Sequence, residues 1–244
     1  MSRITFLLPF RCDGAAPQRA AQLHNFLTSM PVLLPGVDCR FVVCEQTPDG
    51  RRFNKGAVLN AGFREVALTH DDVLCLHDID LIPSPELCAD YARALPPRTV
   101  RHLGATFPRY AGMKRFMGGV LMLRAGDFMR ANGFPNDFEG WGGEDDVLGL
   151  RVRLLGLAVE RGRGALIDLE AIDTHDAKMQ QLRVYKSCGK KKCIKVRKHR
   201  RNGLLGDGLG TVGYALVTHA TVGATTRLTI ALAAETEHLE AARG

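Results

Sequence analysis

Long apolar runs are missing from this sequence of 244 residues. None approaches the roughly 18 uninterrupted apolar residues that a membrane-spanning helix requires. The first apolar run ends at Pro9 and Arg11. Since no basic leader precedes this run and no small-residue cleavage site follows it, it is typical of a first strand rather than of a signal peptide. These absences argue against a membrane span and against a secretory leader.

A disulfide framework is also missing. The chain contains 7 cysteines, an odd number, and most of them stand in apolar runs. This pattern favours reduced, buried thiols in a reducing compartment. Cys188 and Cys193 lie within a lysine cluster, but neither a second cysteine pair nor a histidine pair stands nearby, so they do not indicate a zinc site.

Aromatic residues are few, at 7% of the chain, and there is a single tryptophan. An apolar content of 45% and a charged content of 24% are ordinary for a globular protein and exclude wholesale disorder. The length suits one domain with a full core. Because we find neither an internal repeat nor a domain boundary, we expect a single domain over residues 1–244 with a frayed tail at 235–244.

The net charge of +7 is concentrated in residues 186–201, from Lys186 to Arg201. The simpler interpretation is a solvated, mobile basic loop over about residues 176–206. The alternative is a surface for a polyanion such as an acidic glycan, nucleic acid or phospholipid. Apart from Tyr185, the stretch has no aromatic side chains to stack on bases, which argues against single-stranded nucleic acid.

Apolar runs rich in β-forming residues alternate with segments of helical periodicity. This alternation predicts an α/β fold with a mostly parallel, twisted central sheet flanked by helices. The strands are expected at residues 4–10, 40–45, 73–77, 100–107, 118–123, 166–172, 211–218 and 225–233. The helices are expected at residues 17–30, 55–68, 87–94, 126–132 and 145–155. In such sheets ligands bind beyond the carboxyl ends of the strands, where Arg11, Asp78 and Asp80 stand.

Asp78 and Asp80 follow a buried strand and are two residues apart, so in extended backbone their side chains share one face. Two converging carboxylates suit a hard divalent cation such as Mn²⁺ or Mg²⁺. The alternative is a polar strand end before a turn. His175 could complete the ligand set, and mixed carboxylate and imidazole ligation suits Mn²⁺ better than Mg²⁺. Asp173 is either a further ligand or a turn residue.

Trp141 stands between Gly140 and Gly142 and just before three consecutive acidic residues, at 144–146. The glycines allow the indole to move over a ligand. A flat aromatic ring beside carboxylates is typical of sites that handle sugars. The alternative is that these acids merely favour the first turn of a helix. Asn54 is the expected N-cap of the helix at 55–68, whose free N–H groups could also meet an anion.

Several motifs, in order along the chain, resemble those of the β-1,4-galactosyltransferase family, glycosyltransferase family 7. They stand at residues 9–11, 53–63, 77–83, 118–120, 132–136, 140–146 and 207–211. The sequences at 77–80 and 173–176 come closest to the branch that galactosylates protein-linked xylose. The resemblance implies a GT-A fold and an inverting, Mn²⁺-dependent transfer from UDP-galactose to the 4-hydroxyl of an acceptor sugar.

The resemblance also implies roles for individual residues. By position, Asp145 is the general base. Asp80 and His175 are the metal ligands, with Asp173 as a further candidate. The donor would lie against Pro9, Phe10, Arg11, Phe53, Lys55, Asp78, Phe116, Gly119, Trp141 and Glu144. The acceptor would lie against Trp141, Gly142, Asp145 and Asp146.

Four positions depart from the family pattern. Asp13 stands where many members carry a second arginine, and Lys55 replaces an arginine near the diphosphate. Phe116 replaces the tyrosine of the aromatic gate that favours galactose over N-acetylgalactosamine. Ile172 stands where one branch has a methionine ligand.

Several alternatives remain open at this stage. The donor could be UDP-GalNAc or UDP-glucose, and the acceptor could be xylose, N-acetylglucosamine or glucose. A protein of another class, a non-catalytic module that binds polyanions or glycans, would explain the basic stretch but not the ordered acidic motifs. We expect a cytoplasmic protein if the chain is complete, and the Golgi lumen, where animal relatives work, if it is a clipped catalytic domain.

Overall fold

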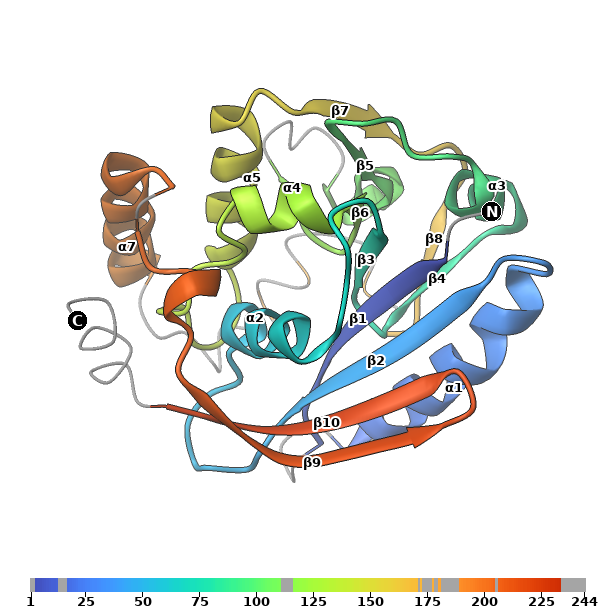
Figure 1. Ribbon diagram of the computed structural model, residues 1–244, viewed down its shortest axis with the longest axis horizontal. Helices are drawn as coiled ribbons and strands as arrows, with labels where there is room; N and C mark the ends of the chain where they lie inside the picture. The colour runs from blue at the N-terminus through green and yellow to red at the C-terminus, as the bar shows by residue number, and fades with distance from the viewer. Residues whose placement is uncertain are drawn as a thin grey trace.

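The structure is a computed structural model and describes residues 3–12, 17–110, 116–170, 172, 177, 180, 189–204 and 206–233. Its centre is an eight-stranded sheet in the order β7-β5-β6-β3-β1-β2-β10-β9 (Figure 1). The strands are β1 (Ile4–Phe10), β2 (Cys39–Gln46), β3 (Val73–His77), β5 (Thr99–His102), β6 (Val120–Arg124), β7 (Ala158–Arg161), β9 (Tyr214–Val222) and β10 (Thr225–Leu232). Pairings β1–β2, β1–β3, β2–β10 and β5–β7 are parallel, and the others are antiparallel. The predicted mostly parallel sheet is therefore confirmed.

Helices cover both faces of this sheet. They are α1 (Gln18–Leu33), α2 (Lys55–Glu65), α3 (Pro85–Ala92), α4 (Ala125–Arg130), α5 (Glu144–Leu154) and α7 (Gly189–Asn202). Side chains of α2, α4 and α5 form one hydrophobic cluster with Leu7 of β1. Side chains of α1 and α3 form the other with Phe6 and Leu8. Because successive strand residues point to opposite faces and both faces are covered, every residue of β1 is buried, and all but Thr5 are apolar.

The periodicity of apolar residues in the sequence predicted most of the strands and helices. The strands at 4–10 and 73–77 have the predicted bounds. The strand expected over 100–107 is only partly correct, because β5 ends at His102 and 3-10 turns follow at Leu103–Thr106 and Pro108–Tyr110. Gly104 explains the change: a Cβ there would lie 2.1 Å from the carbonyl oxygen of Gly118, so the chain turns at a point of close backbone contact.

The basic loop expected over 176–206 is corrected in its second half, where residues 189–202 form helix α7 beside α5 (Figure 1). Lysine and arginine are good helix formers, so a run of them is compatible with a helix once one side chain docks. His199 is that side chain, with 1% of its surface exposed. In the part of the chain that the structure describes, no helix is both long and apolar enough to cross a membrane.

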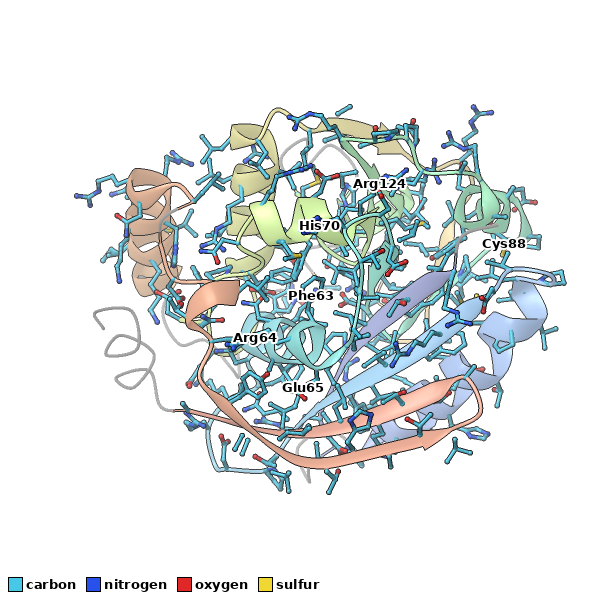
Figure 2. The ribbon with its side chains drawn as sticks, in the orientation of Figure 1. Phe63, Arg64, Glu65, His70, Cys88 and Arg124 are labelled. Atoms are coloured by element: carbon cyan, nitrogen blue, oxygen red, sulfur yellow. The ribbon has the colours of Figure 1, made fainter. Side chains whose placement is uncertain are left out.

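The C-terminal end of α2 is fastened to β9 and to the core. The Tyr214 hydroxyl donates to Glu65 Oε1 at 2.5 Å, and the Arg64 guanidinium lies 5.7 Å from the centre of the Tyr214 ring. Phe63 turns inward, with its ring centre 4.9 Å from that of Phe128 (Figure 2). These contacts fix the direction of α2 and therefore the place of Lys55 at its other end.

A separate two-stranded ribbon lies beside the end of β3. It consists of β4 (Leu81–Pro83) and β8 (Leu166–Asp168), which pair antiparallel with Leu81 opposite Asp168. The backbone N–H of Leu169 also donates to the carbonyl of Asp80 at 2.8 Å. This pairing brings the acidic end of β8 next to the acidic motif that follows β3.

Candidate active site

Three segments distant in sequence meet around the ammonium group of Lys55. Asn54 caps α2, accepting from the N–H of Ala57 at 2.9 Å, and so sets Lys55 as the first helical residue. Lys55 Nζ lies 2.9 Å from Asp78 Oδ1 and 3.4 Å from Asp145 Oδ1. Asp78 follows β3, and Asp145 stands in the first turn of α5. The structure therefore brings together the predicted base and two predicted donor-binding residues.

Gly118 and Gly119 line the same pocket as Lys55. Because β6 pairs antiparallel with β3, its start lies beside the end of β3, and the N–H of Asp78 donates to the carbonyl of Gly119 at 2.9 Å. A small pocket opens here between α2, β3 and α5. It is lined by Lys55, Leu76, Asp78, Met117, Gly118, Gly119, Leu121, Phe134 and Asp145.

The pocket holds strongly interacting charges. Burial raises the pKa of Asp145 to about 8, although the nearby Lys55 ammonium opposes this rise. Burial raises the pKa of Asp78 as well, again against the effect of Lys55. Burial alone would lower the pKa of Lys55, but the surrounding carboxylates raise it well above its ordinary value. Asp145 is therefore a carboxyl group whose affinity for a proton is far above that of an exposed aspartate, as a general base requires.

Asp80 belongs to a group of carboxylates with the spacing of a cation site. One oxygen each of Asp80, Asp168 and Glu170 lies within 4.8 Å of the others. The Arg19 guanidinium bridges two of them, at 3.2 Å from Asp80 Oδ2 and 3.3 Å from Glu170 Oε1. These oxygens already attract a positive group, and an all-oxygen set suits Mn²⁺ or Mg²⁺. The predicted ligands His175 and Asp173 lie outside the described residues.

One wall of the predicted donor site is assembled from β1 and the segment before α2. The Arg11 guanidinium lies 5.8 Å from the centre of the Phe53 ring and donates to the carbonyl of Arg51 at 2.7 Å. Pro9 and Phe10 are buried within β1, so they hold the strand end that presents Arg11. Their contact with a donor stays a prediction.

The loop that carries Trp141 leaves from this wall. The N–H of Gly140 donates to the carbonyl of Phe53 at 2.7 Å. Gly140, Gly142 and Gly143 have φ of 70°, 91° and 104°, a backbone region that favours glycine. The indole of Trp141 is 40% exposed. The glycines that the sequence indicated are thus needed for the shape of the loop.

The other predicted site residues, Glu144, Asp146 and Phe116, differ in how far they are exposed to solvent. Glu144 is buried, with 4% of its surface exposed, whereas Asp146 is exposed. The ring of Phe116 stacks on that of Tyr110, with centres 3.8 Å apart and planes at 24°. Phe116 and Tyr110 form an aromatic wall one residue away from the Gly118–Gly119 pair.

Sequence reasoning missed Arg19, Asp168 and Glu170. Asp168 and Glu170 are also two acids two residues apart at the end of a strand, but the strand predicted over 166–172 placed them inside it, whereas β8 ends at Asp168. Arg19 carries no comparable signal, because it reaches Asp80 across 61 positions of sequence.

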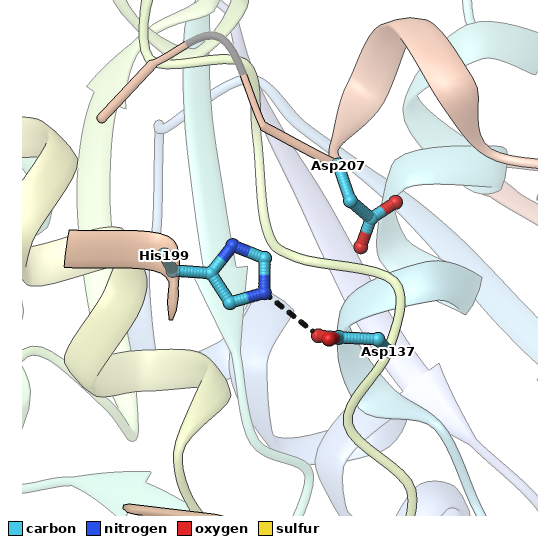
Figure 3. A group of neighbouring side chains, drawn as sticks. All are labelled: Asp137, His199 and Asp207. Carbon is cyan, nitrogen blue, oxygen red and sulfur yellow. Dashed lines mark hydrogen bonds and ion pairs between the residues drawn. The ribbon is translucent and has the colours of Figure 1, made fainter. Parts of the chain in front are cut away.

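A second group of possible ligands, Asp137, His199 and Asp207, lies beside α7 (Figure 3). Their hydrogen bonds are made within the protein. His199 Nε2 lies 2.8 Å from Asp137 Oδ1. The Asp207 carboxylate accepts from the N–H and the side-chain amide of Asn136, at 2.5 and 2.6 Å, and from the Thr211 hydroxyl at 3.0 Å. These hydrogen bonds join three segments of the chain, and only the Nδ1 of His199 is buried without a partner among the described atoms of the group.

Gly118→Ala is expected to lower any activity of this site by about 100-fold, because small displacements of catalytic groups are costly. A Cβ at Gly118 would lie 2.1 Å from Asp145 Oδ2 and 2.7 Å from Phe116 Cζ. Gly210→Ala is the matched control, since its nearest neighbour would be 3.9 Å away. Turnover and thermal melting of both variants test this, and equal turnover of the two would show that Asp145 tolerates displacement.

Two family models match most of this chain. Residues 1–89 match the family described as the N-terminal region of glycosyl transferase group 7, and residues 99–176 match that described as the N-terminal domain of galactosyltransferase. The chain is 35% identical over 246 residues to β-1,4-galactosyltransferase 5 of Mus musculus, covering 97% of this chain and 58% of that protein. It is 36% identical over 172 residues to β-1,4-galactosyltransferase 3 of Bos taurus, covering 63% and 41%. The chain thus spans about half the length of these relatives.

Among solved structures, the fold is similar to the catalytic domain of Drosophila β1,4-galactosyltransferase 7 in complex with xylobiose. The TM-score is 0.75 at 24% identity, with 99% of each chain covered. A mutant of that enzyme in complex with manganese, UDP-Gal and xylobiose matches to the same degree. This likeness concerns the fold and confirms the predicted GT-A type. With its ordered motifs, both family matches and this fold, the chain belongs to glycosyltransferase family 7, the family of the β-1,4-galactosyltransferases.

Proposed function

We propose that this protein transfers galactose from UDP-galactose to the 4-hydroxyl of an acceptor sugar, with inversion at the anomeric carbon. The observation that carries the proposal is the meeting of Lys55, Asp78 and Asp145 in one pocket at the carboxyl end of β3. Asp80 follows the same strand, and the loop of Trp141 leads into the helix that carries Asp145. Membership of the family supports the choice of galactose.

Asp145 takes the proton of the acceptor hydroxyl as the new bond forms. The hydroxyl oxygen attacks the anomeric carbon from the face opposite UDP, and the bond between that carbon and the diphosphate oxygen breaks. Charge accumulates on the sugar as an oxocarbenium-like transition state. Lys55 stands between Asp78 and Asp145 and therefore offers its positive charge to the diphosphate on one side and to the anionic base on the other.

Asp80 would hold a divalent cation, together with Glu170 and Asp168 beside it and with His175 from the segment outside the described residues. A mixed set of carboxylates and imidazole favours Mn²⁺ over Mg²⁺. When bound, the cation supplies Lewis-acid stabilisation of the departing diphosphate. To admit it, Arg19 would have to give up its contacts with Asp80 and Glu170, and Asp168 would have to share the carboxylate that now pairs with Arg109.

We propose a xyloside as the first acceptor to test, because the similar Drosophila structures hold xylobiose. The experiment is incubation with UDP-galactose and Mn²⁺ against xyloside, glucoside and N-acetylglucosaminide acceptors, with mass spectrometry of the products. Parallel reactions with UDP-GalNAc and UDP-glucose test the identity of the donor. We expect UDP-GalNAc to be the poorer donor, because Phe116 disfavours its larger acetamido sugar. Absence of a hexose-extended product with every donor and acceptor would refute the proposal.

The pH dependence of transfer follows from Asp145. Because burial raises its pKa to about 8, the acid form persists at neutral pH, and only the carboxylate can accept a proton. We therefore expect kcat/KM to rise by about tenfold per pH unit between about pH 6 and pH 8 and to level off above that. Initial rates across this range measure it. A flat profile over the same interval would contradict the role of Asp145 as the titrating base.

A second candidate function concerns the exposed face of α7, which we propose as an accessory surface for an acidic glycan. Arg197, Lys198, Arg200 and Arg201 are exposed and form no ion pair within the described part of the chain. Retention on an immobilised acidic polysaccharide, with a steep salt dependence, would support it. Replacing these four residues by glutamine should abolish retention while leaving transfer to a small acceptor unchanged; unaltered retention would refute it.

A further inference from the structure

The loop of Trp141 rests on the ring of Phe138. Phe138 is buried, with 2% of its surface exposed. A Cβ on Gly143 would lie 2.3 Å from Phe138 Cε1, so the backbone at the end of the loop lies directly on the ring. The position of Phe138 therefore sets where the segment from Trp141 to Asp145 can run.

Helix α7 holds Phe138 from the other side. The His199 ring lies 5.7 Å from the Phe138 ring, centre to centre, and Lys195 Nζ lies 6.0 Å from the same ring. The residue before Phe138 is held by the same two side chains. His199 Nε2 lies 2.8 Å from Asp137 Oδ1 (Figure 3), and the Lys195 ammonium donates to the Asp137 carbonyl.

His199 is the one buried side chain among those described in α7, at residues 193–202. Its Nδ1 is buried and has no hydrogen-bond partner in the described structure. A proton on Nδ1 would be a buried donor without an acceptor, so the proton belongs on Nε2, which donates to Asp137. The contact is therefore directional: it needs a donor at the Nε2 position and the carboxylate of Asp137.

We propose that His199 and Asp137 form a latch that positions the Trp141 loop through Phe138 for binding of the acceptor. The inference rests on the proposed function, since the loop borders the site assigned to the acceptor. His199 is a positioning residue, and neither it nor Asp137 touches the reacting atoms. Opening the latch lowers the fraction of molecules whose loop is ready for the acceptor, which raises the apparent KM of the acceptor by the inverse of that fraction.

The test compares His199→Leu, which removes the donor, with His199→Gln, whose side-chain amide can place a donor where Nε2 stands. Asp137→Ala removes the acceptor and leaves α7 intact, in case His199→Leu does not fold. Ile194→Ala, at an exposed position on the same helix outside the proposed glycan surface, is the matched control. Thermal melting identifies the folded variants.

The first readout is the fluorescence of Trp141, the only tryptophan of the chain, and its quenching by acrylamide without substrates. The second is the KM of the acceptor and of UDP-galactose. We expect His199→Leu and Asp137→Ala to increase quenching and to raise the acceptor KM by about tenfold, the effect of one buried hydrogen bond, with the donor KM unchanged. His199→Gln and Ile194→Ala should behave as the wild type.

Wild-type quenching and acceptor KM in folded His199→Leu and Asp137→Ala would overturn the latch. Equal effects of His199→Gln and His199→Leu would overturn the hydrogen bond as its basis. A wild-type protein that transfers no sugar would refute the proposed function, whereas the quenching experiment would still decide whether α7 sets the position of Trp141.

Discussion

Asp145→Asn is expected to lower galactose transfer by about 10²–10⁴-fold, the usual contribution of a general base, while UDP binding stays intact. The amide has the shape of the carboxylate but cannot accept the acceptor proton. Lys55 keeps its contact of 2.9 Å with Asp78, so the donor side of the pocket is preserved. Since burial raises the pKa of Asp145, replacing it by a neutral group should not destabilise the fold.

This variant also separates the two interpretations of the acidic run at 144–146. If Asp145 only favours the first turn of α5, its loss should lower the melting temperature and leave turnover unaffected. Glu86→Gln is the matched control, because Glu86 stands in the first turn of α3 and is exposed. Transfer and melting curves of both variants decide the matter. Near-normal transfer by Asp145→Asn would remove Asp145 from the base role.

Removal of divalent cations is expected to abolish transfer, and Mn²⁺ should restore it better than Mg²⁺. The physical reason is that the diphosphate leaves with charge that Lys55 alone cannot neutralise. Asp80→Asn should weaken Mn²⁺ binding by more than about 100-fold, because even residues that only hydrogen-bond to a metal's ligands typically contribute about 10–100-fold. Titration of Mn²⁺ in the presence of UDP measures this without relying on turnover.

The same titration distinguishes the two groups of possible ligands. His199→Leu should bind Mn²⁺ as the wild type does, because it removes no ligand of the proposed site around Asp80. If Asp80→Asn binds Mn²⁺ normally and His199→Leu does not bind it, the cation site is the group of Asp137, His199 and Asp207 rather than the group around Asp80. Full turnover in the presence of a chelator would refute the metal requirement altogether.

Contacts between near neighbours in sequence are what pattern reasoning could predict. The strands Ile4–Phe10 and Val73–His77 are apolar runs bounded by polar residues, and their bounds were predicted correctly. Asn54 caps α2 as expected. Asp78 and Asp80 share a strand end because of the period of two in extended backbone. Residues 189–202 were predicted to be part of a loop but form a helix. Their high charge indicated a solvated segment, and the pattern gave no sign that one histidine docks against the protein.

By itself, the sequence determined which segments form strands and helices, which strand ends carry acids, and, through motif order, the family. These features depend on residues a few positions apart or on a preserved order of motifs. Only the tertiary structure decided that Arg19 bridges Asp80 and Glu170, the latter 151 positions away, and that α7 supports Phe138 beneath the Trp141 loop. Such pairs are set by strand order, by the register of β4 against β8 and by helix docking, and these depend on the packing of the whole core.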